Sequence, residues 1–263
     1  MYSIERKTEI VNLLETSKRV DVSALAEKFG TSQETIRRDL RELEKEGVVK
    51  RTHGGAVLSK FGNQPSAFQE YPIAIRGIQR FQEKNQICKR AAEFIEDGDT
   101  IFIDNSSTTM YLPKYLAPEC HVTIVTNSIK VLLEYLSAPS PNHVLICLGG
   151  IFNPSNLSVY GGSSLKSAEI YYPNKAFLSC AGISRENILA DSSIYEIDTK
   201  RMMIDRTPEV FLLADYTKFQ KNSQVFLCRM SDVQYLITDS KTAVDKMDFL
   251  DRSNLNLIVA PRS

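Results

Sequence analysis

A chain of 263 residues, 43% of them hydrophobic, can bury a substantial core in one large domain or in two unequal ones. Its 32 lysines and arginines balance its 32 aspartates and glutamates, so bulk charge does not indicate a nucleic-acid-binding protein. No apolar run approaches the ~18 residues that cross a bilayer, and the charged start MYSIERKTEI is unlike a signal peptide. We therefore expect a cytoplasmic protein without a membrane segment.

The cysteines and histidines do not form a metal-binding pattern. The five cysteines include no CxxC pair, and the three histidines are scattered along the chain. A zinc site needs three or four ligands brought together. The sequence therefore predicts buried, reduced thiols, no structural metal and no cofactor.

Residues 3–57 carry the pattern of three short helices followed by two strands. Apolar residues recur at helical spacing in the first two segments, and the second is expected to end at Gly30. The capping-box pattern Thr31-x-x-Glu34 predicts the start of the third helix, which should run to Gly47. The stretch VVKRTHGGAV then offers two β-prone pieces around a glycine turn, which is typical of a wing.

The third predicted helix sorts its side chains by kind around the helix axis. Ile36, Leu40 and Leu43 form an apolar stripe. The basic residues Arg37, Arg38, Arg41 and Lys45 lie opposite that stripe, and the acidic residues Asp39, Glu42 and Glu46 share a separate arc. An ordinary solvated helix would mix both signs around its exposed surface. The basic face and the wing together predict a winged helix-turn-helix, whose second helix enters the major groove of DNA.

The stretch TSQETIRRDLRELEKEGVVKRTHGGAV resembles the amino-terminal signature of the DeoR family of bacterial transcriptional regulators, with its TIRRDL core and trailing HGGA. The resemblance implies sequence-specific binding to double-stranded operator DNA. The candidate DNA-binding residues are Ser32, Gln33, Glu34, Thr35, Arg37, Arg38 and Arg41 on the helix, and Lys50, Arg51 and His53 on the wing. Arginine can bind guanine bidentately and also binds phosphates, so the sequence does not assign a role to each residue.

A larger predicted domain, residues 84–263, follows a region that breaks every periodic pattern with glycine and prolines. We interpret residues 59–83 as a linker, which makes residues 1–58 the first domain. Seven apolar runs in the larger domain read as strands: 100–104, 122–126, 143–148, 176–181, 210–215, 235–239 and 255–260. Such runs, separated by helix-length segments, predict a doubly wound, mostly parallel α/β sheet covered on both faces.

Polar and glycine residues collect where several predicted strands end. They are Asp104, Asn105, Ser106, Ser107, Thr108 and Thr109 after the first strand, and Thr126, Asn127, Gly149, Gly150 and Lys218 after later ones. Open α/β sheets bind ligands at this edge, and a helix beginning at about Thr108 would suit a phosphate. Taken singly, each feature has an ordinary alternative as a helix cap, a turn or a solvated charge. Together they predict that the loop and Lys218 bind a phosphate, with Asp104 accepting from hydroxyl groups of the same ligand.

The same features (the Asp104 loop, VTNS, LGG, CAGIS and ADYTKF) resemble the sugar-phosphate-sensing domain of DeoR regulators, which is similar to ribose-5-phosphate isomerase. The resemblance implies a phosphorylated sugar as effector and repression of a sugar-metabolism operon that the effector relieves, although activation stays open. We expect a homo-oligomer, either a dimer or a tetramer. One departure is Ser106, which stands where the family loop usually has glycine.

Two other functions remain as alternatives. The first is a sugar-phosphate isomerase with an added DNA-binding domain, which would need a carboxylate base beside the sugar. The stretch CAGIS has no carboxylate where the isomerases place theirs, although Glu186, Asp191 and Glu196 lie nearby in sequence. The second is a DNA-binding protein whose large domain only oligomerises. We expect a regulator without enzymatic activity.

Overall fold

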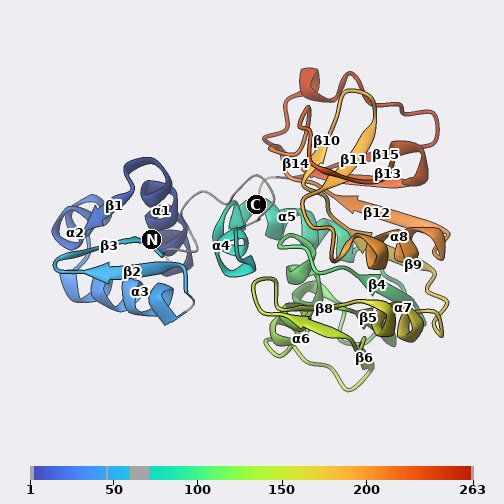
Figure 1. Cartoon of the computed structure of the whole chain (residues 1–263), viewed down its shortest axis with the longest axis horizontal. Helices are drawn as coiled ribbons and strands as arrows, with labels where there is room; N and C mark the ends of the chain where they lie inside the picture. The colour runs from blue at the N-terminus through green and yellow to red at the C-terminus, as the bar shows by residue number, and fades with distance from the viewer. Residues whose placement is uncertain (1–2, 46, 60–70, 262–263) are drawn as a thin grey trace. The chain divides into compact units, whose positions relative to one another are not determined.

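The computed structural model describes residues 3–45, 47–59 and 71–261, and the chain divides into two units, Met1–Phe81 and Gln82–Ser263 (Figure 1). The first unit contains the helices α1 (Ser3–Ser17), α2 (Val22–Phe29) and α3 (Gln33–Lys45), and the antiparallel strands β2 (Val49–Thr52) and β3 (Gly55–Leu58). The predicted winged helix-turn-helix is therefore confirmed. A further strand, β1 (Arg19–Asp21), pairs with β3, and its three residues are too few to leave a pattern in the sequence.

The two glycines of the wing have separate roles. Gly54 adopts φ 81° in the turn between β2 and β3, a conformation that glycine reaches without steric cost. Gly55 permits a close approach between strands, because a Cβ at this position would lie 2.0 Å from the carbonyl oxygen of Val20. The trailing HGGA therefore shapes the wing and joins it to β1.

The cap of α3 differs from the prediction by one residue. Ser32, not Thr31, precedes the helix, and its Oγ accepts a hydrogen bond from the backbone N–H of Thr35 at 3.2 Å. The expected capping box is therefore wrong, because Glu34 falls at the second helical position and its carboxylate pairs with Arg41 instead. Gly47 lies just beyond the end of the helix with φ 73°, and its N–H donates to the carbonyl of Glu44.

Part of the predicted linker is helical. Helix α4 (Ile73–Ile78) lies within it, and Ile75 is buried in the core of the first unit with the apolar residues of α1 and α3. The short run of isoleucines after Pro72 gives too few turns for a periodic signal. Helix α5 (Phe81–Ala92) likewise begins before residue 84. Residues 60–70 lie outside the described part of the chain, and the domain limits at 58 and 84 stay predictions.

Seven parallel strands form the sheet of the second unit, in the order β15-β14-β12-β9-β4-β5-β6. They are β4 (Thr100–Ile103), β5 (Val122–Thr126), β6 (His143–Cys147), β9 (Lys175–Leu178), β12 (Glu209–Leu213), β14 (Tyr235–Asp239) and β15 (Asn256–Ala260). All seven predicted strands are thus present. Their continuous apolar character follows from burial on both faces of the sheet.

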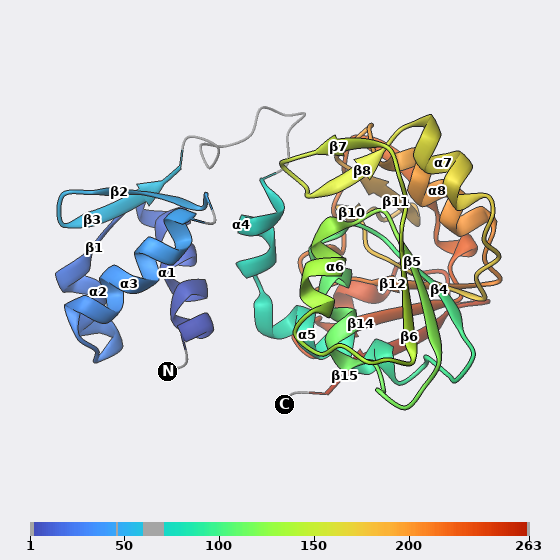
Figure 2. The same cartoon turned by 90° about the horizontal axis from the view of Figure 1, so that it is seen from below.

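Alternating side chains of the sheet supply two cores. Phe177, Phe211 and Tyr235 stack in register across β9, β12 and β14, with ring centroids 4.8 and 4.3 Å apart. The intervening residues, such as Leu178 and Leu212, belong to the other core. Figure 2 shows the helices α7 (Gly162–Ala168) and α8 (Ile197–Asp205) on one side of the sheet, and α5 and α6 (Ile129–Tyr135) on the other.

Several shorter elements were not predicted. They are the hairpin β7 (Ile151–Asn153) and β8 (Ser158–Tyr160), the antiparallel strands β10 (Gly182–Ile183), β11 (Ile188–Asp191) and β13 (Val225–Arg229), and the 3-10 helices η3 (Met230–Asp232) and η4 (Val244–Met247). The helix expected near Thr108 is also a 3-10 helix, η2 (Thr109–Tyr115), with Pro113 inside it.

Three of the cysteines, Cys88, Cys180 and Cys228, are buried thiols, as predicted. The prediction is wrong for Cys147, which is exposed because its strand lies at the edge of the sheet, and Cys120 is only half-buried. Among the described residues, no helix combines the length and the apolar character that a membrane span requires.

Candidate functional site

The inward side of helix α3 is anchored by the predicted apolar stripe and by a buried ion pair. Ile36, Leu40 and Leu43 are fully buried. Asp39 corrects the prediction of an exposed acidic arc, because its carboxylate is 0% exposed and accepts from Arg6 Nε at 2.5 Å. Hydrogen bonding to Asp39 raises the pKa of Arg6, so the guanidinium stays charged. The pair fixes α3 against α1 and determines which side of α3 faces outward.

The candidate DNA-binding residues lie on the outward side of α3 and on the wing. Ser32, Gln33, Glu34, Arg37, Arg38, Arg41, Lys50, Arg51 and His53 are exposed, and Thr35 is half-buried. Arg37 from α3 and Arg51 and His53 from the wing line a common open pocket of about 480 Å³. The helix and the wing thus present their cations side by side, an arrangement suited to a DNA backbone.

Two acidic residues already pair with these cations. Glu34 pairs with Arg41, and its other oxygen lies 3.8 Å from Arg37. Glu44 lies 2.6 Å from Arg51 Nε, and hydrogen bonds from Arg51 lower the pKa of Glu44. Exposed ion pairs of this kind contribute about 0–1 kcal/mol to stability, so a DNA phosphate can replace the carboxylate as the partner of the arginine.

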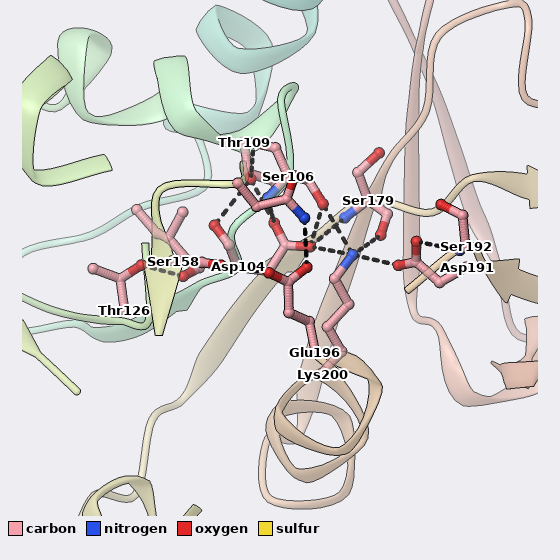
Figure 3. Close-up of polar contacts among 12 residues, drawn as sticks. Asp104, Ser106, Thr109, Thr126, Ser158, Ser179, Asp191, Ser192, Glu196 and Lys200 are labelled. Atoms are coloured by element: carbon pink, nitrogen blue, oxygen red, sulfur yellow. Dashed lines mark hydrogen bonds and ion pairs between the residues drawn. The ribbon is translucent and has the colours of Figure 1, made fainter. Parts of the chain in front are cut away.

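The candidate effector site lies where the chain reverses the direction in which it adds strands to the sheet. From β4 the chain winds outward through β5 and β6, and from β9 it winds the opposite way through β12, β14 and β15. The loops after β4 and β9 therefore flank the topological switch point, the usual ligand site of an open α/β sheet. Asp104 joins the two loops, since one of its oxygens accepts from the backbone N–H of Ser179 at 3.1 Å (Figure 3).

Asp104 is occupied by the protein itself. It is 0% exposed and accepts from the Ser106 backbone N–H, from the hydroxyls of Ser106 and Thr109, and from Ser179. These bonds fold the loop around the carboxylate and turn two of the predicted ligand hydroxyls inward. Asp104 therefore has no exposed oxygen that could accept the hydrogen bond from a sugar hydroxyl that the sequence had led us to expect.

Lys200 is a buried cation of the site that the sequence analysis missed. Its ammonium, from α8, lies 3.1 Å from Asp104 and 2.6 Å from Asp191, and donates to Ser106 Oγ and the Ser179 carbonyl (Figure 3). Burial alone would lower the pKa of Lys200, but the two carboxylates outweigh it and the pKa lies above its ordinary value. Lys200 thus ties the loops after β4 and β9 to β11.

Lys84 of α5 is the second cation that the analysis missed. It is 3% exposed, and its ammonium donates to Ser107 Oγ at 3.0 Å. Within the described residues, the backbone N–H groups of Asn105, Ser107 and Thr108 have no hydrogen-bond partner. Buried N–H groups are rarely left unpaired, so these three are available to a ligand or to water.

Sequence reasoning could have found both lysines. Lys84 precedes Ile87 by three residues, and Lys200 lies three residues after Ile197, so each falls in the apolar stripe of its helix. A lysine in a buried stripe needs an anionic or polar partner. Their partners in the site, however, lie 23 and 94 residues away in sequence and become visible only in the folded chain.

The other predicted effector residues make contacts within the protein. Thr126 Oγ1 donates to the Ile103 carbonyl at 2.6 Å, an internal bond between strands. Asn127 donates to the Val159 carbonyl, but its Oδ1 is buried without a partner among the described residues, as is Asn105 Oδ1. Gly149 and Gly150 are exposed and lead into β7. A Cβ on Gly150 would lie 2.6 Å from the Tyr160 carbonyl oxygen, so this glycine serves the hairpin.

Lys218 follows β12, two strands away from β4. It is half-buried, and its ammonium forms no ion pair with any residue that the structure describes. The structure therefore separates the predicted cation from the Asp104 loop by the end of β9. A bound anion would have to bridge that distance.

Glu196 is a third buried carboxylate near the loop (Figure 3). It accepts from the side-chain amides of Asn153 and Asn156 and from the hydroxyl of Ser158, all from the β7–β8 hairpin. These bonds attach the hairpin to the start of α8. Across residues 3–45, 47–59 and 71–261, no group of three His, Cys, Asp or Glu side chains could hold a metal ion.

Comparisons with known proteins cover both units. Residues 6–60 match the DeoR-like helix-turn-helix domain, and residues 79–240 match the DeoR C-terminal sensor domain. The uncharacterized HTH-type transcriptional regulator YulB of Bacillus subtilis is 34% identical over 100% of this chain and 99% of its own length. The glycerol-3-phosphate regulon repressor of Escherichia coli is 29% identical over 98% of this chain and 99% of its own.

Among solved structures, ribose 5-phosphate isomerase A from Methanocaldococcus jannaschii is 16% identical and covers 51% of this chain and 52% of its own, with a TM-score of 0.38. That likeness is too weak to support any statement about chemistry. The two domain matches and the full-length relative are sufficient for assignment. The chain belongs to the DeoR family of helix-turn-helix transcriptional regulators.

Proposed function

We propose that this DeoR-family regulator represses a sugar-metabolism operon, and that a phosphorylated sugar at the switch point of its sheet releases it from operator DNA. One observation carries the effector assignment. The loop after β4 offers the unpaired N–H groups of Asn105, Ser107 and Thr108 beside the Lys84 ammonium. Backbone N–H groups and an ammonium together suit a phosphate.

The DNA contacts are proposed on geometry and charge. Ser32, Gln33, Glu34, Thr35, Arg37, Arg38 and Arg41 on and just before α3, with Lys50, Arg51 and His53 on the wing, form the proposed interface. The buried Arg6–Asp39 pair supports this orientation of α3. The half-exposed arginines can exchange their carboxylate partners for phosphates at little cost.

The proposed effector contacts differ from the predicted ones in several residues. Asn105, Ser107, Thr108, Asn127, Lys84 and Lys218 are the proposed ligand contacts. Asp104, Ser106, Thr109 and Lys200 keep a place in the site as the residues that shape the loop. The unpaired oxygens of Asn105 and Asn127 would accept from sugar hydroxyls, the role first given to Asp104.

We propose binding without turnover. Isomerisation needs a carboxylate free to take a proton from carbon. Asp104 and Glu196 accept several hydrogen bonds each, and Asp191 pairs with Lys200. With these three carboxylates engaged and Glu186 exposed, the geometry supports a sensor rather than an isomerase.

The relatives support a phosphorylated effector and repression, since one of them is named a glycerol-3-phosphate regulon repressor. We propose a homo-oligomer, a dimer or tetramer, so that two copies of the winged unit meet two operator half-sites. The effector would have to bind one arrangement of these units more tightly than the other.

Replacing Lys218 with alanine should weaken effector binding at least ~10-fold, because a charge-assisted contact to phosphate contributes about 1.5–3 kcal/mol. Operator binding without effector should be unchanged. Calorimetric titration with glycerol 3-phosphate, glucose 6-phosphate and ribose 5-phosphate, each beside its unphosphorylated parent, measures the effect. Lys221→Ala, an exposed lysine on the same loop, is the matched control.

Equal affinity for a sugar with and without its phosphate would contradict the proposed site. An indifferent Lys218→Ala variant would remove Lys218 from it and leave Lys84 as the cation.

A further inference from the structure

An acidic side chain stands in the middle of the basic surface of α3. Glu34 is 67% exposed, pairs with Arg41 seven residues along the helix and lies 3.8 Å from Arg37. Arg37 is 53% exposed and Arg41 47% exposed, so all three side chains face solvent together. A surface that served only to attract phosphates would gain nothing from a carboxylate at this place.

We propose that Glu34 is a specificity-determining residue, which disfavours DNA of arbitrary sequence and reads a cytosine in the operator. The proposal rests on α3 being the helix that enters the major groove. In the free protein, Arg37 and Arg41 neutralise Glu34. On DNA, phosphates compete for those arginines and leave the carboxylate beside a polyanion.

The chemistry of the base edges decides whether that carboxylate is tolerated. Cytosine presents an amino donor, N4, in the major groove, and a carboxylate can accept from it. Guanine presents two acceptors, and thymine presents an acceptor and a methyl group, so neither compensates the charge. Adenine has one donor next to an acceptor. The carboxylate therefore weakens binding to most DNA sequences. Where a cytosine faces Glu34, the hydrogen bond from cytosine N4 offsets that loss.

The same helix supplies a matched control. Glu42 carries the same charge on α3 but pairs with Lys7 of α1 at 2.5 Å, and the hydrogen bond from Lys7 lowers the pKa of Glu42. Its carboxylate is 43% exposed and pairs with neither Arg37 nor Arg41, although the nearby charges of Arg38 and Lys45 also lower its pKa. Glu34→Gln and Glu42→Gln therefore remove one negative charge each from the same helix, on different sides.

The test uses the full chain as wild type and the Glu34→Gln, Glu42→Gln and Arg37→Ala variants. Each protein selects from a random duplex library to obtain its base preferences, and its affinity for an unrelated duplex is measured across a salt series. Glu34→Gln should bind the unrelated duplex about 10-fold more tightly, because the variant no longer leaves a carboxylate uncompensated beside the phosphates. It should also lose a cytosine preference at one position in each half-site, because glutamine pairs best with adenine. Glu42→Gln should keep the wild-type base preferences and should change affinity for the unrelated duplex much less than Glu34→Gln does, because Lys7 already neutralises Glu42.

Unchanged base preferences in Glu34→Gln would overturn the proposal, and so would equal changes in Glu42→Gln, which would reflect net charge alone. Arg37→Ala separates this failure from a wrong DNA interface. If that variant binds DNA as the wild type does, α3 is not the contacting helix and both proposals fall. Because Glu34 and Glu42 are partly exposed, unchanged melting temperatures are expected and are checked alongside.

Discussion

Replacing Lys200 with methionine should destabilise the larger unit by about 3–5 kcal/mol, because the change leaves Asp104 and Asp191 buried without their shared counter-charge. Methionine is similar to lysine in length and apolar stem, so the loss is one of charge and hydrogen bonds rather than of volume. At about 2–4 °C per kcal/mol for a domain of this size, the melting temperature should fall by roughly 6–20 °C. Differential scanning calorimetry of the full chain measures the shift.

The control for this change is Lys166→Met on α7. Lys166 is exposed and forms no ion pair with a described residue, so its replacement should alter stability by less than about 0.5 kcal/mol. Similar melting temperatures for the two variants would show that the Lys200 ion pairs do not hold the loops together. The assignment of Asp104 to a structural role would then have to be withdrawn.

Replacing both Arg37 and Arg38 with alanine should weaken operator binding by about 30-fold or more, since contacts of this kind contribute about 1–3 kcal/mol each. The salt dependence should become shallower as well. Each lost phosphate contact removes roughly 0.9 from the slope of log affinity against log salt, so the slope should change by about 1.8. Fluorescence anisotropy with a labelled operator across a salt series measures both quantities.

A matched double variant, Arg185→Ala with Arg252→Ala, removes the same charge from exposed positions in the larger unit. It should bind DNA as the wild type does. If the two double variants behave alike, long-range charge and not the face of α3 accounts for the effect, and the interface is misassigned.

The sequence predicted the two architectures because their signals are local and repeated. Each strand of the large sheet is a contiguous apolar run, and Ile36, Leu40 and Leu43 recur at helical spacing. Short elements escaped, since β1 and β10 have three and two residues and leave no period. The helix after the β4 loop contains Pro113 and is a 3-10 helix, so the expectation of an anion there rests on unpaired N–H groups and not on a helix dipole.

The site was harder to predict because its residues meet only in three dimensions. The strand-end position of Asp104 was evident, but the Ser106 and Thr109 hydroxyls that occupy it cannot be told from ligand-facing ones in a sequence. Asp39 was grouped with the other acidic residues of α3 because a helical wheel shows one helix alone. Arg6, 33 residues away, is the partner that allows the Asp39 carboxylate to be buried. The sequence places these polar residues along the chain but does not reveal which side chains they bond to.

The central claim is that a phosphorylated sugar in the larger unit controls how tightly the chain binds its operator. The direct measurement is the affinity of the wild-type chain for its selected operator, with and without glycerol 3-phosphate, glucose 6-phosphate and ribose 5-phosphate and with each unphosphorylated parent. The account predicts that at least one phosphorylated sugar weakens binding by about 5–150-fold, the usual range of allosteric coupling, while its parent does not. If a parent sugar acts as strongly as its phosphate, or if no phosphorylated sugar changes operator affinity or raises the melting temperature, the account is contradicted.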